Sequence, residues 1–329
     1  MEQRPLGSTG LNVSALGFGC GAVGGLMVRG DAAEQRQAVS RALDAGITYF
    51  DTAASYGQNS ESETNLGRVM AELGAWPRVV VGTKVRLRPD DLTDPARAIR
   101  ASLQASLQRL GRADVDILHL HNPITLHIDG GAAGTVDLDL ALGQIAQGLR
   151  DVVRAGLAHH AGLTGLGDIE AVHEAVLSES YETVQTYFNV LNPSAGYPAH
   201  TGGQQDFEGL IDTAARADVG VIVIRALAAG AAAGEPRRAV NAGDPGRGLV
   251  SGATYDADLD HAQRLRSLAA ELGTEGPVEL AIRFAQAKAG VSTVLVGYST
   301  LAHLEDAIRF TNRGPLSADA IQRVLELSA

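Results

Sequence analysis

The chain has 329 residues, of which 45% are hydrophobic and 20% are charged, and its formal net charge is −11 at pH 7. This composition is typical of a globular protein with a large core, and the length fits either two ordinary domains or one large α/β barrel. Because the chain is acidic and has no basic block, its composition argues against binding to nucleic acid or to an anionic membrane.

The single cysteine, Cys20, excludes an internal disulfide and a cluster of thiolate metal ligands. The N-terminal residues lack the apolar region of a signal peptide, and no apolar stretch approaches the ~20 residues needed to span a bilayer. We therefore expect a cytoplasmic protein that needs no membrane partner. The sequence does not indicate an oligomeric state.

Short apolar strands and amphipathic helices alternate along the chain. A turn signal at residues 7–10 predicts an N-terminal hairpin, and eight strands follow it, each with a helix after it. The expected strands are 15–19, 47–50, 78–83, 115–120, 158–163, 183–186, 220–224 and 293–296. The expected helices are 31–45, 62–73, 94–110, 138–155, 168–177, 207–215, 259–272 and 277–287, with two more beginning at Leu301 and Ser317.

Several of these strands are continuous apolar runs, which is the pattern of a parallel sheet covered by helices. Eight β/α units predict one (β/α)₈ barrel domain over residues 1–329. A doubly wound Rossmann sheet is the alternative, since residues 19–24 have the glycine spacing of its dinucleotide-binding turn. The helix that should follow that turn begins only near Asp31, which favours the barrel. Two long loops, 122–136 and 225–256, follow the fourth and seventh strands, at the end of a barrel where active sites lie.

Ionisable residues end three successive predicted strands: Asp51, Lys84 and His121. Tyr56 lies in the loop just after Asp51. A phenol has an unperturbed pKa of ~10, so Tyr56 needs a nearby cation to act as a proton donor, and Lys84 is the candidate. A plain ion pair at the barrel rim would explain Asp51 and Lys84 alone, but the coincidence of four such residues favours an active site. His119 shares a strand face with His121, and we expect the histidine nearer the strand end to be the functional one.

These segments resemble the aldo-keto reductase superfamily along nearly the whole chain. Residues 5–19 are similar to its N-terminal hairpin and first strand, and residues 45–57 to its most specific signature. The resemblance implies that Tyr56 is the general acid or base, that Lys84 tunes it, that Asp51 holds Lys84, and that His121 orients the substrate oxygen. It also implies direct hydride transfer to or from a nicotinamide, with no metal.

The resemblance implies a set of cofactor contacts at the strand ends. Thr164 keeps a hydroxyl where the family usually has a serine, whereas Gly165 lacks the amide that usually follows. Ile224 stands where the family has an aromatic ring stacked on the nicotinamide. The expected cofactor contacts are Gly19, Cys20, Asp51, Thr164, Gln185, Arg225, Ala226, Leu227, Gly230, Gly297, Ser299, His303 and Asp306.

The choice of cofactor depends on the residues near the adenosine ribose. Gly297 and His303 stand where members that use NADPH place lysine and arginine to pair with the 2′-phosphate. We therefore predict NAD as the cofactor. NADP is the alternative, if another basic residue such as Arg309 reaches the phosphate.

Gly21 and Asn122 align with positions that are commonly aromatic in members acting on apolar aldehydes, and only 4% of all residues are aromatic. An open, polar pocket suits a sugar or a similar small carbonyl compound, contacted by Tyr56, His121 and Asn122. With Gly21 and Asn122 at these positions, the chain is similar to the NAD-linked branch of the superfamily that oxidises aldoses or L-fucose-like sugars at C1 to lactones.

Three alternatives stay open. One is a pyridoxal-type or general aldehyde reductase of the same superfamily. Another is a non-catalytic nucleotide-binding module like the β-subunits of ion channels. The third is an aldolase-like enzyme with Lys84 as a Schiff-base nucleophile, although a lysine paired with Asp51 would stay protonated and react poorly.

Overall fold

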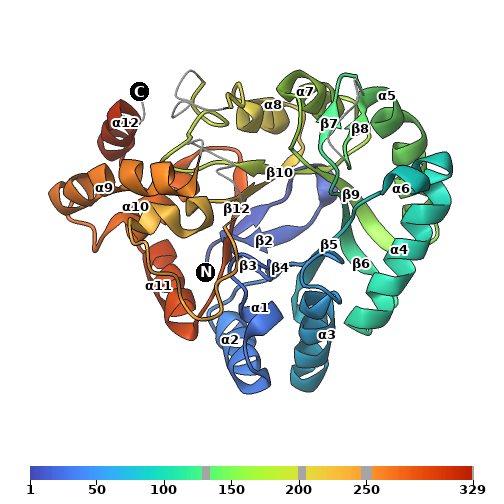
Figure 1. The fold of residues 1–329 in the computed structure, drawn as a ribbon, viewed down its shortest axis with the longest axis horizontal. Coiled ribbons are helices and arrows are strands. Elements are labelled where there is room, and N and C mark those ends of the chain that lie inside the picture. Colours follow the sequence, from blue (N-terminus) through green and yellow to red (C-terminus); the bar gives the residue numbers. More distant parts are fainter. Residues whose placement is uncertain (128–133, 199–204, 246–253, 328–329) are drawn as a thin grey trace.

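The structure is a computed structural model, and it describes residues 1–127, 134–198, 205–245 and 254–327. Eight parallel strands close into a barrel, and the helices form a ring around it (Figure 1). This confirms the predicted (β/α)₈ fold. The barrel strands are β3 (Leu16–Gly19), β4 (Tyr49–Asp51), β5 (Val80–Val85), β6 (Val115–Leu120), β9 (Ala158–Thr164), β10 (Thr183–Tyr187), β11 (Gly220–Ile224) and β12 (Val291–Gly297).

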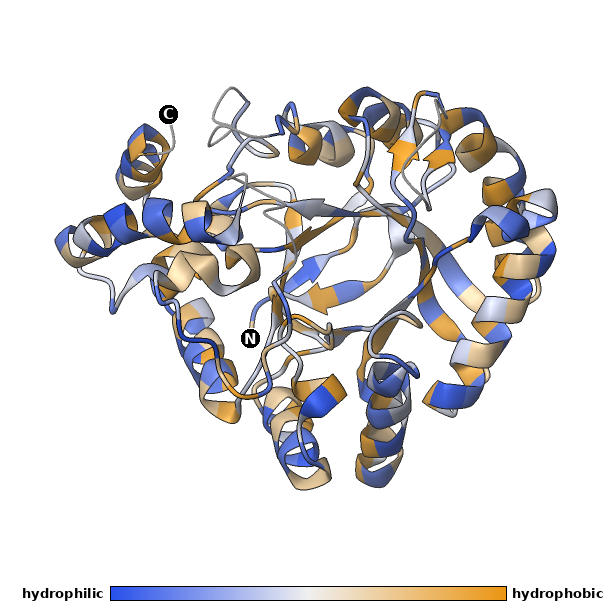
Figure 2. Cartoon of the chain, in the orientation of Figure 1, coloured by the Kyte–Doolittle hydropathy of each residue, from blue (hydrophilic) through white to orange (hydrophobic). Residues whose placement is uncertain are grey.

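All eight predicted strands are present with small shifts of their ends, and the outer helices lie close to the predicted ranges. Their apolar faces pack on the strands, and Figure 2 shows the helices striped with hydrophobic and hydrophilic residues. The helices are α1 (Leu26–Arg29), α2 (Ala32–Asp44), α3 (Glu61–Leu73), α4 (Pro95–Leu110), α5 (Leu138–Leu140), α6 (Ala146–Arg154), α7 (Ile169–Leu177), α8 (Leu210–Arg216), α9 (Tyr255–Glu271), α10 (Pro277–Ala287), α11 (Leu301–Asn312) and α12 (Ala318–Leu327).

Capping residues fix where several of these helices begin. The Asp31 carboxylate accepts a hydrogen bond from the backbone N–H of Glu34 and starts α2, and Asp94 starts α4 in the same way just before Pro95. The Thr300 hydroxyl caps α11, which begins directly after the loop that ends β12. This cap places the start of α11 beside the carboxyl end of the barrel.

The predicted N-terminal hairpin consists of β1 (Gln3–Pro5) and β2 (Asn12–Ser14), which pair antiparallel. It lies across the middle of the ring in Figure 1 and closes the amino-terminal end of the barrel. Leu6 and Val13 are fully buried there, packed in one cluster with barrel residues that include Tyr49. Because this end is closed, the cavity described below opens at the carboxyl ends of the strands.

The two predicted long loops carry short elements of their own. The first contains β7 (Ile124–Thr125) and β8 (Val136–Asp137), and the second contains a 3₁₀ helix over Ala228–Ala233. Residues 128–133 and 246–253 of these loops lie outside the described residues. None of the helices in the described ranges has the length and apolar character that a membrane span requires.

Candidate active site

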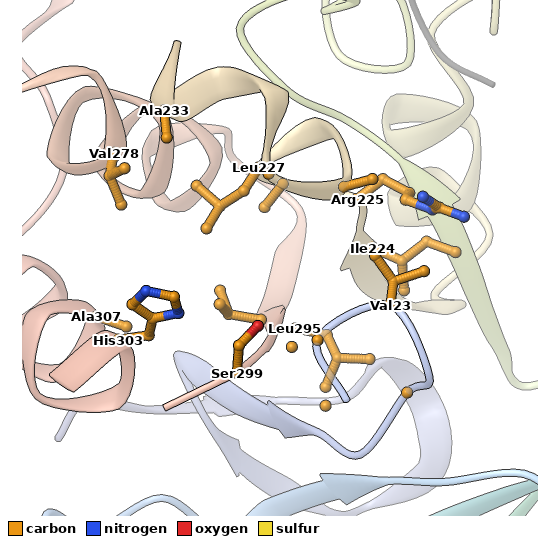
Figure 3. A pocket seen from close by; sticks show the side chains of 18 of the residues that line it. Val23, Ile224, Arg225, Leu227, Ala233, Val278, Leu295, Ser299, His303 and Ala307 are labelled. Atoms are coloured by element: carbon orange, nitrogen blue, oxygen red, sulfur yellow. The ribbon is translucent and has the colours of Figure 1, made fainter. Parts of the chain in front are cut away.

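A cavity of about 850 Å³ opens at the carboxyl ends of the barrel strands. Its volume falls in the range of small-molecule and cofactor sites. Figure 3 shows His303 and Val278 at one end, Ser299 and Leu227 in the middle, and Val23, Ile224 and Arg225 at the other end. The predicted site residues that line the cavity are Gly19, Asp51, Tyr56, His121, Thr164, Gln185, Arg225, Ala226, Leu227, Gly230, Gly297, Ser299, His303 and Asp306.

Asp51 and Lys84 form a buried ion pair at the ends of β4 and β5. The Lys84 ammonium also donates to the backbone oxygen of Thr52 at 2.8 Å. The other carboxylate oxygen of Asp51 accepts hydrogen bonds from Gln185 Nε2 at 2.5 Å and from the Tyr49 hydroxyl at 3.3 Å. Asp51 therefore holds Lys84 and is itself held from β10 and from its own strand.

The Lys84 ammonium lies 4.7 Å from the centre of the Tyr56 ring. Burial raises the pKa of the Tyr56 phenol, and the positive charges of Lys84 and Arg225 oppose this effect. Lys84 thus lowers the pKa of Tyr56, as predicted, but the effect of burial is larger, and the net pKa lies above its ordinary value. The pKa of Lys84 is also raised, because Asp51 and Tyr56 together outweigh the lowering by burial, which keeps the lysine charged.

His121 faces Tyr56, with ring centroids 6.0 Å apart and ring planes at 85°. Burial and repulsion by Lys84 and Arg86 lower the pKa of His121 to about 3. The imidazole is therefore neutral at physiological pH and can donate one hydrogen bond. His119 is fully buried inside the barrel and pairs with the Thr183 hydroxyl at 3.1 Å, as expected for the histidine with a packing role.

Two of the predicted contacts do not reach the cavity. Cys20 is 1% exposed. Its backbone N–H donates to the backbone oxygen of Asp51, and its backbone oxygen accepts from the Ser62 hydroxyl. Because neighbouring residues alternate in direction, Gly19 and Gly21 line the cavity and the Cys20 side chain points away from it. We therefore withdraw the prediction that Cys20 contacts the cofactor.

The prediction for Asn122 is also corrected. Its side chain is fully buried, accepts from the backbone N–H of Leu87 at 2.9 Å, and donates to the backbone oxygens of Leu87 and Gly134 at 2.8 Å each. These three bonds join the loop after β5 to the loop after β6. The side chain is thus a brace between two loops, and the prediction that it contacts substrate is withdrawn.

The cofactor end of the cavity fits a nicotinamide dinucleotide on two observations. The Thr164 hydroxyl is buried, belongs to a residue of the cavity wall, and has no hydrogen-bond partner among the described residues. The turn at Ala228, Ala229 and Gly230 is built of small residues with positive φ angles, and Ala229 and Gly230 line the cavity, so a pyrophosphate can approach its backbone closely. Thr164 would hold the carboxamide, and the turn beginning at Leu227 would hold the pyrophosphate.

Acidic and basic side chains alternate beside His303, at the opposite end from Ile224. Arg309 pairs with Glu275 and, at 2.6 Å, with Asp306, and Arg313 pairs with Glu275. Glu275, Asp306 and Arg309 all line the cavity. Arg309 therefore does reach this end of the cavity, but two carboxylates already neutralise its charge.

Several cavity residues were not predicted from the sequence. Tyr187 lies two residues after Gln185 on the same face of β10, so strand alternation was a signal that could have found it. Arg238, Tyr255 and Glu275 belong to the 225–256 loop, to α9 and to the α9–α10 connection. No local pattern marks these three, because distant parts of the chain bring them to the cavity.

The family model of the aldo/keto reductases matches residues 15–329. The chain therefore belongs to the aldo/keto reductase family, a family of oxidoreductases that use nicotinamide cofactors.

The comparisons also find individual relatives. L-glyceraldehyde 3-phosphate reductase of Escherichia coli O157:H7 is 27% identical over 98% of this chain and 91% of its own length. D-threo-aldose 1-dehydrogenase of a Pseudomonas species is 34% identical over 47% of this chain and 51% of its own length. The solved structure of aldo-keto reductase AKR11C1 from Bacillus halodurans in its holo form superposes with a TM-score of 0.76 at 22% identity, over 100% of this chain and 97% of that one. This structural likeness concerns the fold.

Proposed function

We propose that the protein transfers hydride between NAD(H) and a small polar carbonyl compound, oxidising an aldose at C1 or reducing a hydroxyaldehyde. The observation that carries the proposal is the buried Asp51–Lys84 pair beside the Tyr56 phenol, with Asp51 and Tyr56 in the wall of the cavity. Charged residues are rarely buried without a partner or a function. In this proposal the pair exists to place one cation beside the proton donor.

The residues divide the work as follows. The bound nicotinamide supplies or accepts the hydride. Tyr56 gives a proton to the carbonyl oxygen in reduction and takes it back in oxidation, and Lys84 stabilises the phenolate that forms. The neutral imidazole of His121 donates a hydrogen bond to the same oxygen and orients it.

The preference for NAD rests on the charge around Arg309. A 2′-phosphate needs unpaired cationic donors, and here it would compete with Glu275 and Asp306 for the guanidinium. The two hydroxyls of the NAD ribose can instead donate to such carboxylates. The acidic side chains at this end of the cavity thus support NAD and disfavour NADP.

The substrate class rests on the wall near Tyr56. A Cβ placed on Gly21 would lie 3.7 Å from the Tyr56 ring, so this glycine leaves open the space beside the phenol. Two relatives are named for sugar or triose substrates, which agrees with a polar ligand in that space.

A panel of aldoses and aldehydes with NAD(H) and NADP(H), followed by the absorbance of reduced nicotinamide, tests the proposal. We expect turnover of aldoses or short hydroxyaldehydes, with a higher kcat/KM for NAD(H). A higher kcat/KM with NADP(H) would contradict the cofactor assignment. Turnover restricted to apolar aldehydes would contradict the substrate class.

A further inference from the structure

Arg225 lies in the cavity wall directly after β11, in a backbone conformation that side chains other than glycine seldom adopt. Its φ angle is 57°, in the left-handed region, where the Cβ of a residue other than glycine is crowded by the backbone. In Figure 3 its side chain lies beside Ile224 and Val23, at the opposite end of the cavity from His303. Local strain of this kind is characteristic of functional sites.

Among the described residues, the guanidinium of Arg225 has only neutral partners. Its Nη1 donates to the backbone oxygen of Pro245 at 3.2 Å, and its Cζ lies 5.9 Å from the centre of the Tyr187 ring. Within the described ranges, no carboxylate lies at ion-pair distance from it, whereas Arg309 on the same cavity has two. A guanidinium has five N–H donors, and most of those on Arg225 have no partner in the part of the chain that the structure describes.

This charge lies in the wall of the same cavity as Tyr56 and His121. Among the residues that influence the Tyr56 phenol, Arg225 is a second cation besides Lys84. Lys84 is neutralised by Asp51, whereas Arg225 has no such counter-charge among the described residues. Counting the described residues, the cavity wall at Arg225 therefore carries an unbalanced positive charge, in a chain whose net charge is −11. A partly buried cation gains most from a ligand that brings the opposite charge.

We propose that Arg225 binds an anionic group of the substrate, a phosphate ester or a carboxylate, while Tyr56 and His121 hold its carbonyl oxygen. The proposal rests on the proposed function and narrows its substrate class to acidic sugars, sugar phosphates or acidic aldehydes. A neutral sugar would offer Arg225 hydroxyl acceptors without charge. The competing role for Arg225 is contact with the cofactor pyrophosphate, and the experiment separates the two roles.

The experiment compares matched substrates that differ in charge: D-glyceraldehyde 3-phosphate against D-glyceraldehyde, and D-glucuronate against D-glucose. The wild-type protein, Arg225→Gln, Arg225→Lys and a control, Arg237→Gln, are assayed with NAD(H). Arg237 is an exposed arginine of the same cavity wall. The measured quantity is the ratio of kcat/KM for the anionic substrate to that for its neutral partner.

We expect Arg225→Gln to lower this ratio about 10- to 100-fold in at least one pair, because a charge-assisted hydrogen bond is lost. Arg225→Lys should give an intermediate ratio, and Arg237→Gln should leave it within about twofold of the wild type. The pair that responds identifies the anion as phosphate ester or carboxylate. An unchanged ratio in Arg225→Gln overturns the proposal. So does an equal loss for both substrates accompanied by a weaker affinity for NADH, because that result assigns Arg225 to the cofactor.

A second measurement does not require turnover. 3-Phosphoglycerate resembles the anionic substrate but has no aldehyde, and we expect it to raise the Tm of the wild-type protein with NADH bound more than that of Arg225→Gln. Equal shifts in the two proteins also overturn the proposal. If the wild type binds 3-phosphoglycerate through Arg225 but turns over no carbonyl compound, the proposed function fails while the anion site stands.

Discussion

The ammonium group of Lys84 lies 4.7 Å from the centre of the Tyr56 ring, and its ion pair with Asp51 is buried. In this arrangement the lysine cannot leave the phenol without breaking a buried pair. Burial holds the phenol in its protonated form, and the cation stabilises the phenolate when the proton moves. The first two predictions test the parts of this arrangement.

Replacing Tyr56 with phenylalanine removes the proposed proton donor and leaves the ring in place. We expect kcat for carbonyl reduction to fall about 10²- to 10⁴-fold, the usual contribution of a general acid. Fluorescence titration should show an affinity for NADH within about threefold of the wild type. The control is Tyr187→Phe, which changes a second tyrosine of the cavity wall. Its kcat should fall much less than that of Tyr56→Phe. Unchanged turnover in Tyr56→Phe would reject the tyrosine mechanism and favour a nucleotide-binding role.

Replacing Lys84 with methionine leaves Asp51 buried without its cation. Removing one partner of a buried ion pair costs about 3–5 kcal/mol, so urea unfolding should show a free energy of unfolding lower by that amount. The double variant Asp51→Asn/Lys84→Met should recover most of this loss, because no buried charge remains. Both variants should be nearly inactive. Equal destabilisation in the single and double variants would mean that packing, and not the ion pair, accounts for the loss.

His121 makes the stability of the protein depend on pH in the acid range. Its pKa is about 3 in the folded protein against ~6.5 in an unfolded chain, so between these values only the unfolded chain binds the proton. Stability is therefore lost as the pH falls below ~6.5. We expect the urea midpoint of His121→Gln to depend less steeply on pH than that of the wild type between pH ~6 and ~4. For the wild type, kcat/KM should show no ionisation near pH ~6.5. An ionisation there, absent in His121→Gln, would mean that the imidazole titrates normally.

The brace at Asn122 can be separated from a substrate contact. Asn122→Ala leaves buried backbone groups of Leu87 and Gly134 without partners, and we expect the free energy of unfolding to fall by about 2–4 kcal/mol. KM for the substrate should change less than about threefold when measured well below the Tm of the variant. A large rise in KM with little change in stability would restore Asn122 as a substrate contact.

The barrel could be predicted from the sequence because each β/α unit has its own hydrophobic pattern, and parallel strands place their ends at one edge. For the same reason Asp51, Lys84 and His121 could be found together, since each ends one of three neighbouring strands. The errors at Cys20 and Asn122 have a common cause. Both lie where a strand gives way to a loop, and there the sequence alone does not establish which side chains turn inward.

The rest of the cavity depends on contacts between distant segments. Glu275 lies between α9 and α10 and meets Arg309 of α11, a pairing that no local pattern indicates. The raised pKa of Tyr56 was also beyond prediction, because burial outweighs the effect of Lys84 and burial depends on the packed structure. The sequence indicated that Lys84 and Asp51 lie near the phenol. It did not indicate how deeply the phenol is buried, and therefore not the net change of its pKa.

The ion pairs of Arg309 give the last prediction, a change of cofactor preference. Glu275→Gln/Asp306→Asn removes the two carboxylates that pair with Arg309 and leaves its guanidinium free to bind a 2′-phosphate. We expect the ratio of kcat/KM for NADP(H) to that for NAD(H) to rise about 10-fold or more, through a lower KM for NADP(H).

The control for this change is Glu271→Gln, which breaks the ion pair with Arg323 outside the cavity and should leave the ratio within about twofold of the wild type. Raising the salt concentration should reduce the gain of the double variant, because the new contact joins partly exposed charges. If the double variant has the same ratio of kcat/KM for NADP(H) to that for NAD(H) as the wild type, the carboxylates around Arg309 do not determine the cofactor preference. The preference would then have to come from the shape of the wall formed by Gly297 and His303.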